Sequence, residues 1–193
     1  MKEKLRNSED SLETAIRIAI AGNVIDMGIG KSFNIFEDLE KILVQDFGIF
    51  HLEQFKDKLS RVESILYLGD NAGESVFDRI LIEELGKDVV YVVRDSPVLN
   101  DVTYEDAVDS GLGEVSEIIS SGSNAPGTIL KKCKPDFIER FNQAEMIISK
   151  GQGNYETLSE TKQSIFFLLK TKCKVIARDL QVKEGDIILK HIN

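Results

Sequence analysis

The sequence predicts an α/β protein: a three-layer, Rossmann-like and mainly parallel sheet that follows a helical N-terminal segment. From residue 64 onward, short apolar runs alternate with helical patterns, which is typical of crossover units covering both faces of a parallel sheet. Before residue 64, apolar residues recur at helical spacing only. We therefore divide the 193 residues into a helical segment, 1–63, and an α/β core, 64–193, expected to form one structural domain.

The N-terminal segment is expected to contain three helices. The first has Asn7 or Ser8 available as its cap and stops near Gly22, and a capping box of Asn34 and Glu37 opens the second. The apolar face of the first helix is formed by Leu12, Ala15, Ile16, Ala19 and Ile20, and that of the second by Phe36, Leu39 and Leu43. The apolar face of the third helix is formed by Leu52, Phe55, Leu59 and Val62.

The core is expected to alternate strands and helices. Apolar runs predict strands at residues 65–69, 89–93, 116–119, 146–148, 165–169, 175–177 and 187–189. Helical spacing predicts helices at residues 75–86, 103–110, 135–143 and 156–163. Because such crossovers are right-handed, the turns that follow the strands are expected to share one edge of the sheet.

Composition excludes several classes of function. The chain has 33 acidic and 24 basic residues, and this charge of −9 argues against a nucleic-acid or anionic-membrane surface. No apolar run approaches the ~20 residues that a membrane span needs, and the first residues form no signal-peptide core, so a cytoplasmic protein is expected. Cys133 and Cys173 match no metal-ligand spacing, and two histidines are too few for a histidine-rich metal site. The chemistry is therefore expected to come from carboxylates, amides and lysines.

Four turns at the strand ends carry the polar side chains that suit such chemistry. They lie at residues 70–74, 94–103, 120–128 and 149–156, and the first reads Asp70-Asn71-Ala72-Gly73-Glu74. Carboxylate and amide oxygens suit a hard divalent cation such as Mg²⁺ or Mn²⁺. Glycine- and serine-rich turns offer backbone N–H groups to an anion, and a lysine adds a point charge for phosphate. The turns together predict a site for a divalent cation and a phosphate group.

Three motifs stand out in these turns: the Asp70–Glu74 run, Asn100-Asp101-Val102-Thr103, and the run from Lys150 to Glu156, Lys-Gly-Gln-Gly-Asn-Tyr-Glu. Together they resemble the DUF89 family of metal-dependent damage-control phosphatases, in its prokaryotic and mostly archaeal branch. The run from Ala21 to Asp26, Ala-Gly-Asn-Val-Ile-Asp, resembles an upstream motif of the same branch. The resemblance implies a three-layer α/β domain that hydrolyses small phosphorylated metabolites such as sugar phosphates, supported by Mg²⁺, Mn²⁺, Co²⁺ or Ni²⁺.

The resemblance also assigns residues. Carried over, the metal ligands are Asp70, Asn71 and Asp101, and Lys150 lies near the phosphate. The remaining substrate-binding candidates are Asn154 from the fourth turn, Ser123 and Asn124 from the third turn, and Asn23 and Asp26 from the upstream motif. Structural roles remain open for several of them: Asp101, Asn23 and Asp26 as helix caps, and Asn154 as part of an ordinary turn.

The expected reaction is attack by a metal-activated water on the phosphate. Lys150 and the backbone of residues 122–128 would hold the phosphate oxygens, and Asp70 or Glu74 would take the proton of the water. Asp70 itself as nucleophile is an open alternative. There is no Asp-x-Asp pair after the first strand, so a haloacid-dehalogenase type of aspartyl phosphate is not indicated.

The sequence leaves other classes of function open. A noncatalytic protein that binds phosphorylated metabolites is the main alternative, or a subunit that needs a separate helical partner. A nucleotide-binding module is disfavoured because no Gly-x-Gly-x-x-Gly or Walker loop follows the first strand. No S-adenosylmethionine loop is evident for methylation of carboxylates. Members of this branch usually have a longer helical N-terminal region, so exposed apolar surface on the N-terminal helices is expected, with self-association or a helical partner as the consequence.

Overall fold

A computed structural model describes residues 5–22 and 35–193, and of residues 35–39 only the backbone. The helices are α2 (Ser11–Gly22), α3 (Ile35–Val44), α4 (Leu52–Arg61), α5 (Ser75–Leu85), α6 (Tyr104–Asp109), α7 (Pro135–Gln143), α8 (Gln152–Leu158) and α9 (Lys174–Leu180). The strands are β1 (Phe47–Phe50), β2 (Ser64–Leu68), β3 (Asp88–Val93), β4 (Glu117–Ser120), β5 (Ile147–Lys150), β6 (Ile165–Lys170) and β7 (Ile187–Ile192). Short 3₁₀ turns are η2 (Ala72–Glu74), η3 (Leu112–Glu114) and η4 (Leu130–Lys132).

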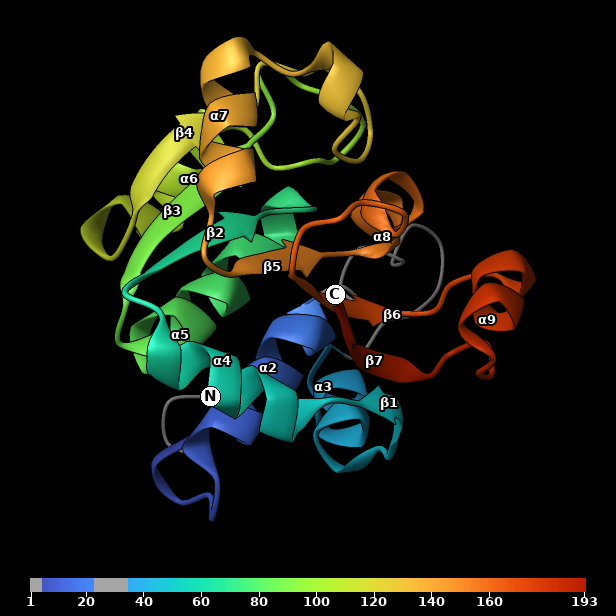
Figure 1. Ribbon diagram of the computed structural model, residues 1–193. Helices are drawn as coiled ribbons and strands as arrows, with labels where there is room; N and C mark the ends of the chain where they lie inside the picture. The colour runs from blue at the N-terminus through green and yellow to red at the C-terminus, as the bar shows by residue number, and fades with distance from the viewer. Residues whose placement is uncertain (1–4, 23–34) are drawn as a thin grey trace.

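The strands form one seven-stranded sheet in the order β1-β7-β6-β5-β2-β3-β4 (Figure 1). Strands β4, β3, β2, β5 and β6 are mutually parallel, so their carboxyl ends share one edge. The chain runs outward from β2 to β3 and β4, and then returns to place β5 on the other side of β2. This reversal makes the space between the ends of β2 and β5 a topological switch point, where open α/β sheets bind ligands.

Helices cover both faces of the sheet, which confirms the predicted fold class (Figure 1). On one face, α2 and α5 pack against side chains such as Tyr67 and Phe166. On the other face, α7, α8 and α9 pack against the alternate side chains of the same strands, such as Leu68 and Phe167. This alternation explains why the central strands are apolar throughout, since both of their faces are buried.

Local sequence explains where the helices begin and end. Asp10 caps α2, because its Oδ1 accepts the backbone N–H of Glu13 at 3.0 Å. Thr103 and Asp106 form a capping box at the start of α6, and Pro135 opens α7. Helix α5 ends at Gly86, which adopts the left-handed φ of 60° that glycine tolerates.

The structure corrects several sequence-based expectations. The first 63 residues are not all helical, because Phe47–Phe50 form β1, which pairs in parallel with β7. Residues 175–177 are not a strand: they lie in α9, where Val175 is exposed while Ile176 and Ala177 are buried, a helical pattern of burial. The cap of α2 is Asp10, whereas the Ser8 hydroxyl donates to the Leu5 carbonyl. The capping box expected at Asn34 and Glu37 lies outside the described residues and side chains.

Strand β7 also has a direction that the pattern did not predict. It runs antiparallel to β6, so its carboxyl end and that of β1 lie at the opposite edge from the other strands. The shared edge is therefore formed by five strands. Within residues 5–22 and 35–193, no helix has the length and apolar character that crossing a membrane requires.

Candidate functional site

The turns after β2 and β3 are held together by backbone hydrogen bonds. The Val102 N–H donates to the Asp70 carbonyl and the Ala72 N–H donates to the Asn100 carbonyl, both at 2.8 Å. The two bonds make a short antiparallel bridge between Asn71 and Asp101. Two turns that lie 30 residues apart in the sequence are thus fixed side by side at the switch point.

This bridge brings the three predicted metal ligands together. Asp70, Asn71 and Asp101 are 9%, 6% and 7% exposed. The side-chain amide of Asn71 donates to Asp70 Oδ2 at 3.1 Å and to Glu74 Oε1 at 2.5 Å. Because both acceptors are carboxylate oxygens, the amide orientation is fixed by this hydrogen bonding.

Gly151 makes room for the Asp70 carboxylate. Gly151 has a φ of +79°, and a Cβ on it would lie 1.8 Å from Asp70 Oδ2. Its N–H donates to the Leu168 carbonyl of β6 at 3.0 Å, which fixes the turn in place. Only glycine satisfies both the backbone conformation and the close approach at this position.

The electrostatics of the site favour a cation. Burial raises the pKa of Asp70 to about 8, the charges of Glu74 and Asp101 add to this effect, and Lys150 and Lys172 oppose it. The buried charged side chains of the described residues comprise four acids and two bases: Asp70, Glu74, Asp78 and Asp101 against Arg94 and Lys150. When all six are ionised, this cluster carries a net charge of −2, which a divalent cation would balance.

The donor set fits a hard cation with few protein ligands. Two carboxylates and one side-chain amide are oxygen ligands of the kind that Mg²⁺ and Mn²⁺ take, with water completing the coordination. In the described part of the chain, no three His, Cys, Asp or Glu side chains are grouped as a metal-binding cluster. The candidate set contains only two side chains of those types, Asp70 and Asp101.

Lys150 lies beneath this site in a buried ion-pair cluster. Its ammonium donates to Glu74 Oε2 at 2.8 Å and to Asp78 Oδ1 at 2.5 Å, and all three side chains are 0% exposed. Burial acts to lower the pKa of Lys150, but the charges of Asp78 and Glu74 outweigh burial and raise it above the ordinary value. The lysine predicted to lie near the phosphate thus has two carboxylates as neighbours, and its assignment to phosphate stays a prediction.

Asp78, which binds Lys150, also binds two buried tyrosines. The hydroxyls of Tyr67 and Tyr91 donate to its two carboxylate oxygens at 2.8 Å each, from rings stacked 5.4 Å apart. Burial, followed by the charge of Asp78, raises the pKa of both tyrosines well above the ordinary value. Both tyrosines therefore remain protonated donors.

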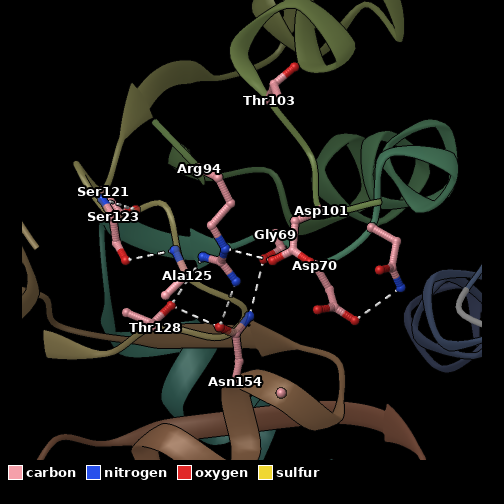
Figure 2. Close-up of polar contacts among 12 residues, drawn as sticks. Gly69, Asp70, Arg94, Asp101, Thr103, Ser121, Ser123, Ala125, Thr128 and Asn154 are labelled. Carbon is pink, nitrogen blue, oxygen red and sulfur yellow. Dashed lines mark hydrogen bonds and ion pairs between the residues drawn. The ribbon is translucent and has the colours of Figure 1, made fainter. Parts of the chain in front are cut away.

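Arg94 joins three of the four turns. Figure 2 shows its guanidinium reaching from the end of β3, where Nε donates to Asp101 Oδ2 at 2.7 Å. The other nitrogens donate to Thr128 Oγ1 at 3.4 Å and Asn154 Oδ1 at 3.2 Å. Asn154 is fully buried, and its amide nitrogen donates to the carbonyls of Gly69 and Lys150. In the structure Asn154 therefore connects the turns, and its assignment to substrate stays a prediction.

The third turn is organised by its own hydroxyls. The hydroxyls of Ser120, Ser121 and Ser123 accept the backbone N–H of Gly122, Ser123 and Ala125, and Thr157 accepts that of Thr128. These four N–H groups therefore have partners within the chain, and the assignment of this backbone to an anion stays a prediction. Ser123 is buried, whereas Asn124 is exposed.

The structure connects most of the predicted site residues. Asp70, Asn71, Glu74, Asp101 and Lys150 belong to one buried polar cluster. Asn23 and Asp26 lie outside the described residues. Sequence reasoning missed Arg94 and Asp78. A signal existed for Asp78, because it shares the helical spacing of the buried residues Leu81, Ile82 and Leu85 and is thus an acid on an apolar helix face.

The fold and this cluster define an α/β protein with a carboxylate-rich polar site at the switch point of its parallel sheet. Comparison with known proteins gives the family. A model of the damage-control phosphatase ARMT1-like domain matches residues 1–188. The chain belongs to this family.

The similarity to individual relatives supports the same family. The chain is 43% identical over 182 residues to a damage-control phosphatase of Pyrococcus horikoshii, covering 91% of this chain and 63% of that protein. It is 34% identical over 198 residues to a damage-control phosphatase of Archaeoglobus fulgidus, covering 98% and 68%. A crystal structure of a DUF89 family protein from Pyrococcus horikoshii matches with a TM-score of 0.88 and 40% identity, covering 97% of this chain and 68% of that one. The chain thus spans roughly two thirds of the length of the relatives that it matches.

Proposed function

We propose that this chain is a metal-dependent phosphatase that hydrolyses small phosphorylated metabolites, such as sugar phosphates. Relatives named damage-control phosphatases support the phosphatase class. The observation that carries the proposal is the convergence of Asp70, Asn71 and Asp101 at the switch point, within a buried cluster of four acids and two bases. A divalent cation balances the net negative charge of such a cluster and offers the phosphate of a substrate a positive centre to bind.

Asp70, Asn71 and Asp101 would hold the metal, which is Mg²⁺, Mn²⁺, Co²⁺ or Ni²⁺ in this proposal. Such an ion supplies Lewis acidity and acidifies a water molecule. Each ligand has a neighbour that orients it. Asp101 accepts from the Arg94 guanidinium, Asp70 accepts from the Asn71 amide, and the Asn71 amide also donates to Glu74. The absence of a side chain at Gly151 leaves room for the Asp70 carboxylate. Neighbours that orient the ligands in this way raise metal affinity.

The remaining groups bind substrate and move a proton. Glu74 is 0% exposed, with Asn71 on one carboxylate oxygen and Lys150 on the other, whereas Asp70 is 9% exposed. This contrast supports Asp70 over Glu74 as the group that accepts the proton of the attacking water. Lys150 has a third ammonium hydrogen beyond those given to Glu74 and Asp78, and we assign that hydrogen to a phosphate oxygen.

The test is a screen of divalent metals against a panel of phosphate esters, with the whole chain. We expect hydrolysis that a chelator abolishes and that added Mg²⁺, Mn²⁺, Co²⁺ or Ni²⁺ restores. Asp70→Asn and Asp101→Asn should lose both hydrolysis and calorimetric metal binding, because each removes one anionic ligand. Asp95→Asn is the matched control, since Asp95 lies in the same turn as Asp101 but forms an exposed ion pair with Lys134.

Three outcomes bear on the proposal. Unchanged metal affinity in Asp70→Asn and Asp101→Asn would overturn the ligand assignment. Binding of phosphate esters without turnover, under every metal, would overturn the phosphatase and favour a noncatalytic binding protein. Equal losses of hydrolysis and metal affinity in Asp95→Asn and Asp101→Asn would show that removing any carboxylate of this turn has the same effect, so that Asp101 has no special role as a ligand.

A further inference from the structure

Strands β2 and β5 separate directly before the residues of the site. The pairing between them ends at Leu68 and Ser149. Beyond this pair, the Gly69 N–H donates to a carbonyl of β3 and the Gly151 N–H donates to a carbonyl of β6, each at 3.0 Å. The two strand ends therefore no longer bind each other at the level where the site begins, as expected at a topological switch point.

The side chain of Asn154 joins the two strand ends at this level. Its amide nitrogen donates to the Gly69 carbonyl at 3.1 Å and to the Lys150 carbonyl at 2.8 Å. Gly69 directly precedes Asp70, and Lys150 directly precedes Gly151, over which the Asp70 carboxylate lies. One amide group thus holds the backbone of Asp70 next to the turn that leaves room for its carboxylate.

The oxygen of the same amide connects to the other acidic ligand. Asn154 Oδ1 accepts from the Arg94 guanidinium at 3.2 Å and from the Thr128 hydroxyl at 2.8 Å (Figure 2). Arg94 in turn donates through Nε to Asp101 Oδ2 at 2.7 Å. The orientation of the Asn154 amide is fixed, because the reverse orientation would place its NH₂ group against a cation and its oxygen against two carbonyls.

The hydrogen-bonding capacity of Asn154 is fully used. A side-chain amide has two N–H donors and an oxygen that accepts two hydrogen bonds. The carbonyls of Gly69 and Lys150 take both donors, Arg94 and Thr128 take both acceptor positions, and the residue is 0% exposed. A contact with substrate would require one of these bonds to break, and leaving a buried polar group unpaired is costly.

We propose that Asn154 is a positioning residue, which holds Asp70 and Asp101 in place for the metal and does not contact the substrate. This inference rests on the proposed function and adds to it the side chain that couples the two acidic ligands. Thr128 assists in this role, because its hydroxyl accepts from Arg94 at 3.4 Å and donates to Asn154.

The first test compares Asn154→Ala with the matched control Tyr155→Phe. Asn154→Ala is a neutral replacement, so the charge of the site is unchanged. We expect its metal affinity in calorimetry to fall at least tenfold, with a lower kcat at saturating metal. The inhibition constant of inorganic phosphate at saturating metal should stay within about twofold, because no substrate contact is lost. Tyr155→Phe removes a hydrogen bond to Asp179 from the same helix and should match the unaltered chain in all three measurements.

The second test uses Thr128, and it applies even if Asn154→Ala does not fold. Thr128→Val keeps the shape of the side chain and removes only the hydroxyl that fixes the Asn154 amide. We expect metal affinity to fall about fivefold, the equivalent of one hydrogen bond. Thr128→Ser keeps the hydroxyl and should recover most of the metal affinity, a rescue that a purely steric role of Thr128 would not give.

The outcomes separate this inference from the proposed function. If the unaltered chain hydrolyses phosphate esters and Asn154→Ala raises KM and the phosphate inhibition constant with metal affinity unchanged, Asn154 binds substrate and this inference alone is overturned. Metal affinity that is equal in Thr128→Val, Thr128→Ser and the unaltered chain would also overturn it. If the unaltered chain binds metal but hydrolyses nothing, weaker metal binding by Asn154→Ala and Thr128→Val still supports Asn154 while the phosphatase fails. If the unaltered chain binds no metal, both are overturned.

Discussion

Two buried basic side chains support the site from opposite sides, and they differ in the groups that they bind. Lys150, from the end of β5, donates to the carboxylates of Glu74 and Asp78. Arg94, from the turn after β3, donates to one carboxylate, that of Asp101, and to the neutral acceptors of Thr128 and Asn154. Both are almost completely excluded from solvent.

This difference in binding partners indicates what each basic side chain contributes to the site. An ammonium is a compact point charge, and Lys150 uses it to offset two acids drawn from η2 and α5. A guanidinium is a rigid planar fork, and Arg94 uses it to hold acceptors from three separate turns in fixed positions. Lys150 thus compensates charge, whereas Arg94 fixes geometry. Substitutions at Lys150 and Arg94 separate the two roles.

The largest effect is expected from Lys150→Met. Removal of one partner from a buried ion pair leaves an uncompensated charge, here two acids, at a cost of about 3–5 kcal/mol in the free energy of unfolding. Denaturant unfolding at neutral pH measures it. A loss close to that of the exposed control Lys174→Met would contradict the role of Lys150 in charge compensation.

A double variant sharpens this test. Lys150→Met combined with Asp78→Asn removes one of the two acids together with the lysine, so part of the lost stability should return. If the second substitution adds its own full penalty instead, the two side chains are not coupled. If the domain remains folded, Lys150→Met should also weaken phosphate binding more than metal binding. An equal loss of metal affinity would make Lys150 part of the support of the metal.

Gly151→Ala tests the residue that separates Lys150 from the first helix turn of α8. A Cβ there would overlap the Asp70 carboxylate and would force a φ of +79° on alanine. We expect a loss of about 2–3 kcal/mol in unfolding free energy and a clear loss of metal affinity. Gly86→Ala is the control, because Gly86 also has a positive φ, +60°, but has nothing within 4 Å of an added Cβ.

The control separates backbone strain from displacement of Asp70. Gly86→Ala should cost about 1 kcal/mol, typical of alanine in a left-handed conformation, and leave metal binding unchanged. If both variants bind metal equally well, the position of the Asp70 carboxylate over Gly151 does not matter for the metal.

Arg94→Lys tests geometry without removing the charge. A lysine at this position keeps a cation near Asp101 but cannot reach the acceptors of three turns at once. We expect a loss of about 1–2 kcal/mol in unfolding free energy, smaller than that of Lys150→Met. Metal affinity should fall about tenfold, the lower end of the range for loss of an orienting neighbour. Unchanged stability and metal affinity would show that charge alone suffices at Arg94.

The sequence predicted the order of elements well where long periodic patterns exist. The strands at 89–93 and 165–169 and the helix at 135–143 are confirmed almost to the residue. The pattern failed where the element is short. β1 has only four residues, with Gly48 among them, and the apolar run 175–177 reads equally as a strand or as a helix. The antiparallel direction of β7 depends on tertiary pairing, which periodicity does not encode.

The candidate site could be predicted in part. Asp70, Asn71 and Asp101 follow strand ends in a parallel sheet, so their convergence follows from topology. The partners of Lys150 could not be predicted, because Glu74 and Asp78 lie more than 70 residues away and meet it only through the packing of α5 on the sheet. Arg94 was visible in the second turn, but nothing in the sequence indicates that its guanidinium turns inward to Asn154.

The smallest loss of unfolding free energy is expected at the partly exposed ion pair of Asp10 and Lys56. This loss is the reference against which the losses at the buried Lys150 and Arg94 are compared. Asp10 caps α2 and also accepts from Lys56 of α4 at 2.6 Å, with about a third of each side chain accessible. The backbone N–H of Glu13, and then the Lys56 ammonium, lower the pKa of Asp10 below the ordinary value of 3.8. Asp10→Ala should cost about 1 kcal/mol at neutral pH, mostly through the cap.

The pH dependence of this loss follows from the sign of the shift. A carboxylate whose pKa is lower in the folded chain contributes stability that is present above pH 3.8 and is lost as the pH falls through the folded value. The difference in unfolding free energy between the unaltered chain and Asp10→Ala should therefore shrink below pH 3.8. Asp10→Asn keeps a capping oxygen, so it should lose less than Asp10→Ala and show little change with pH. If Asp10→Asn and Lys56→Met instead match the loss seen for Arg94→Lys, burial does not distinguish the two cations of the site from a surface pair.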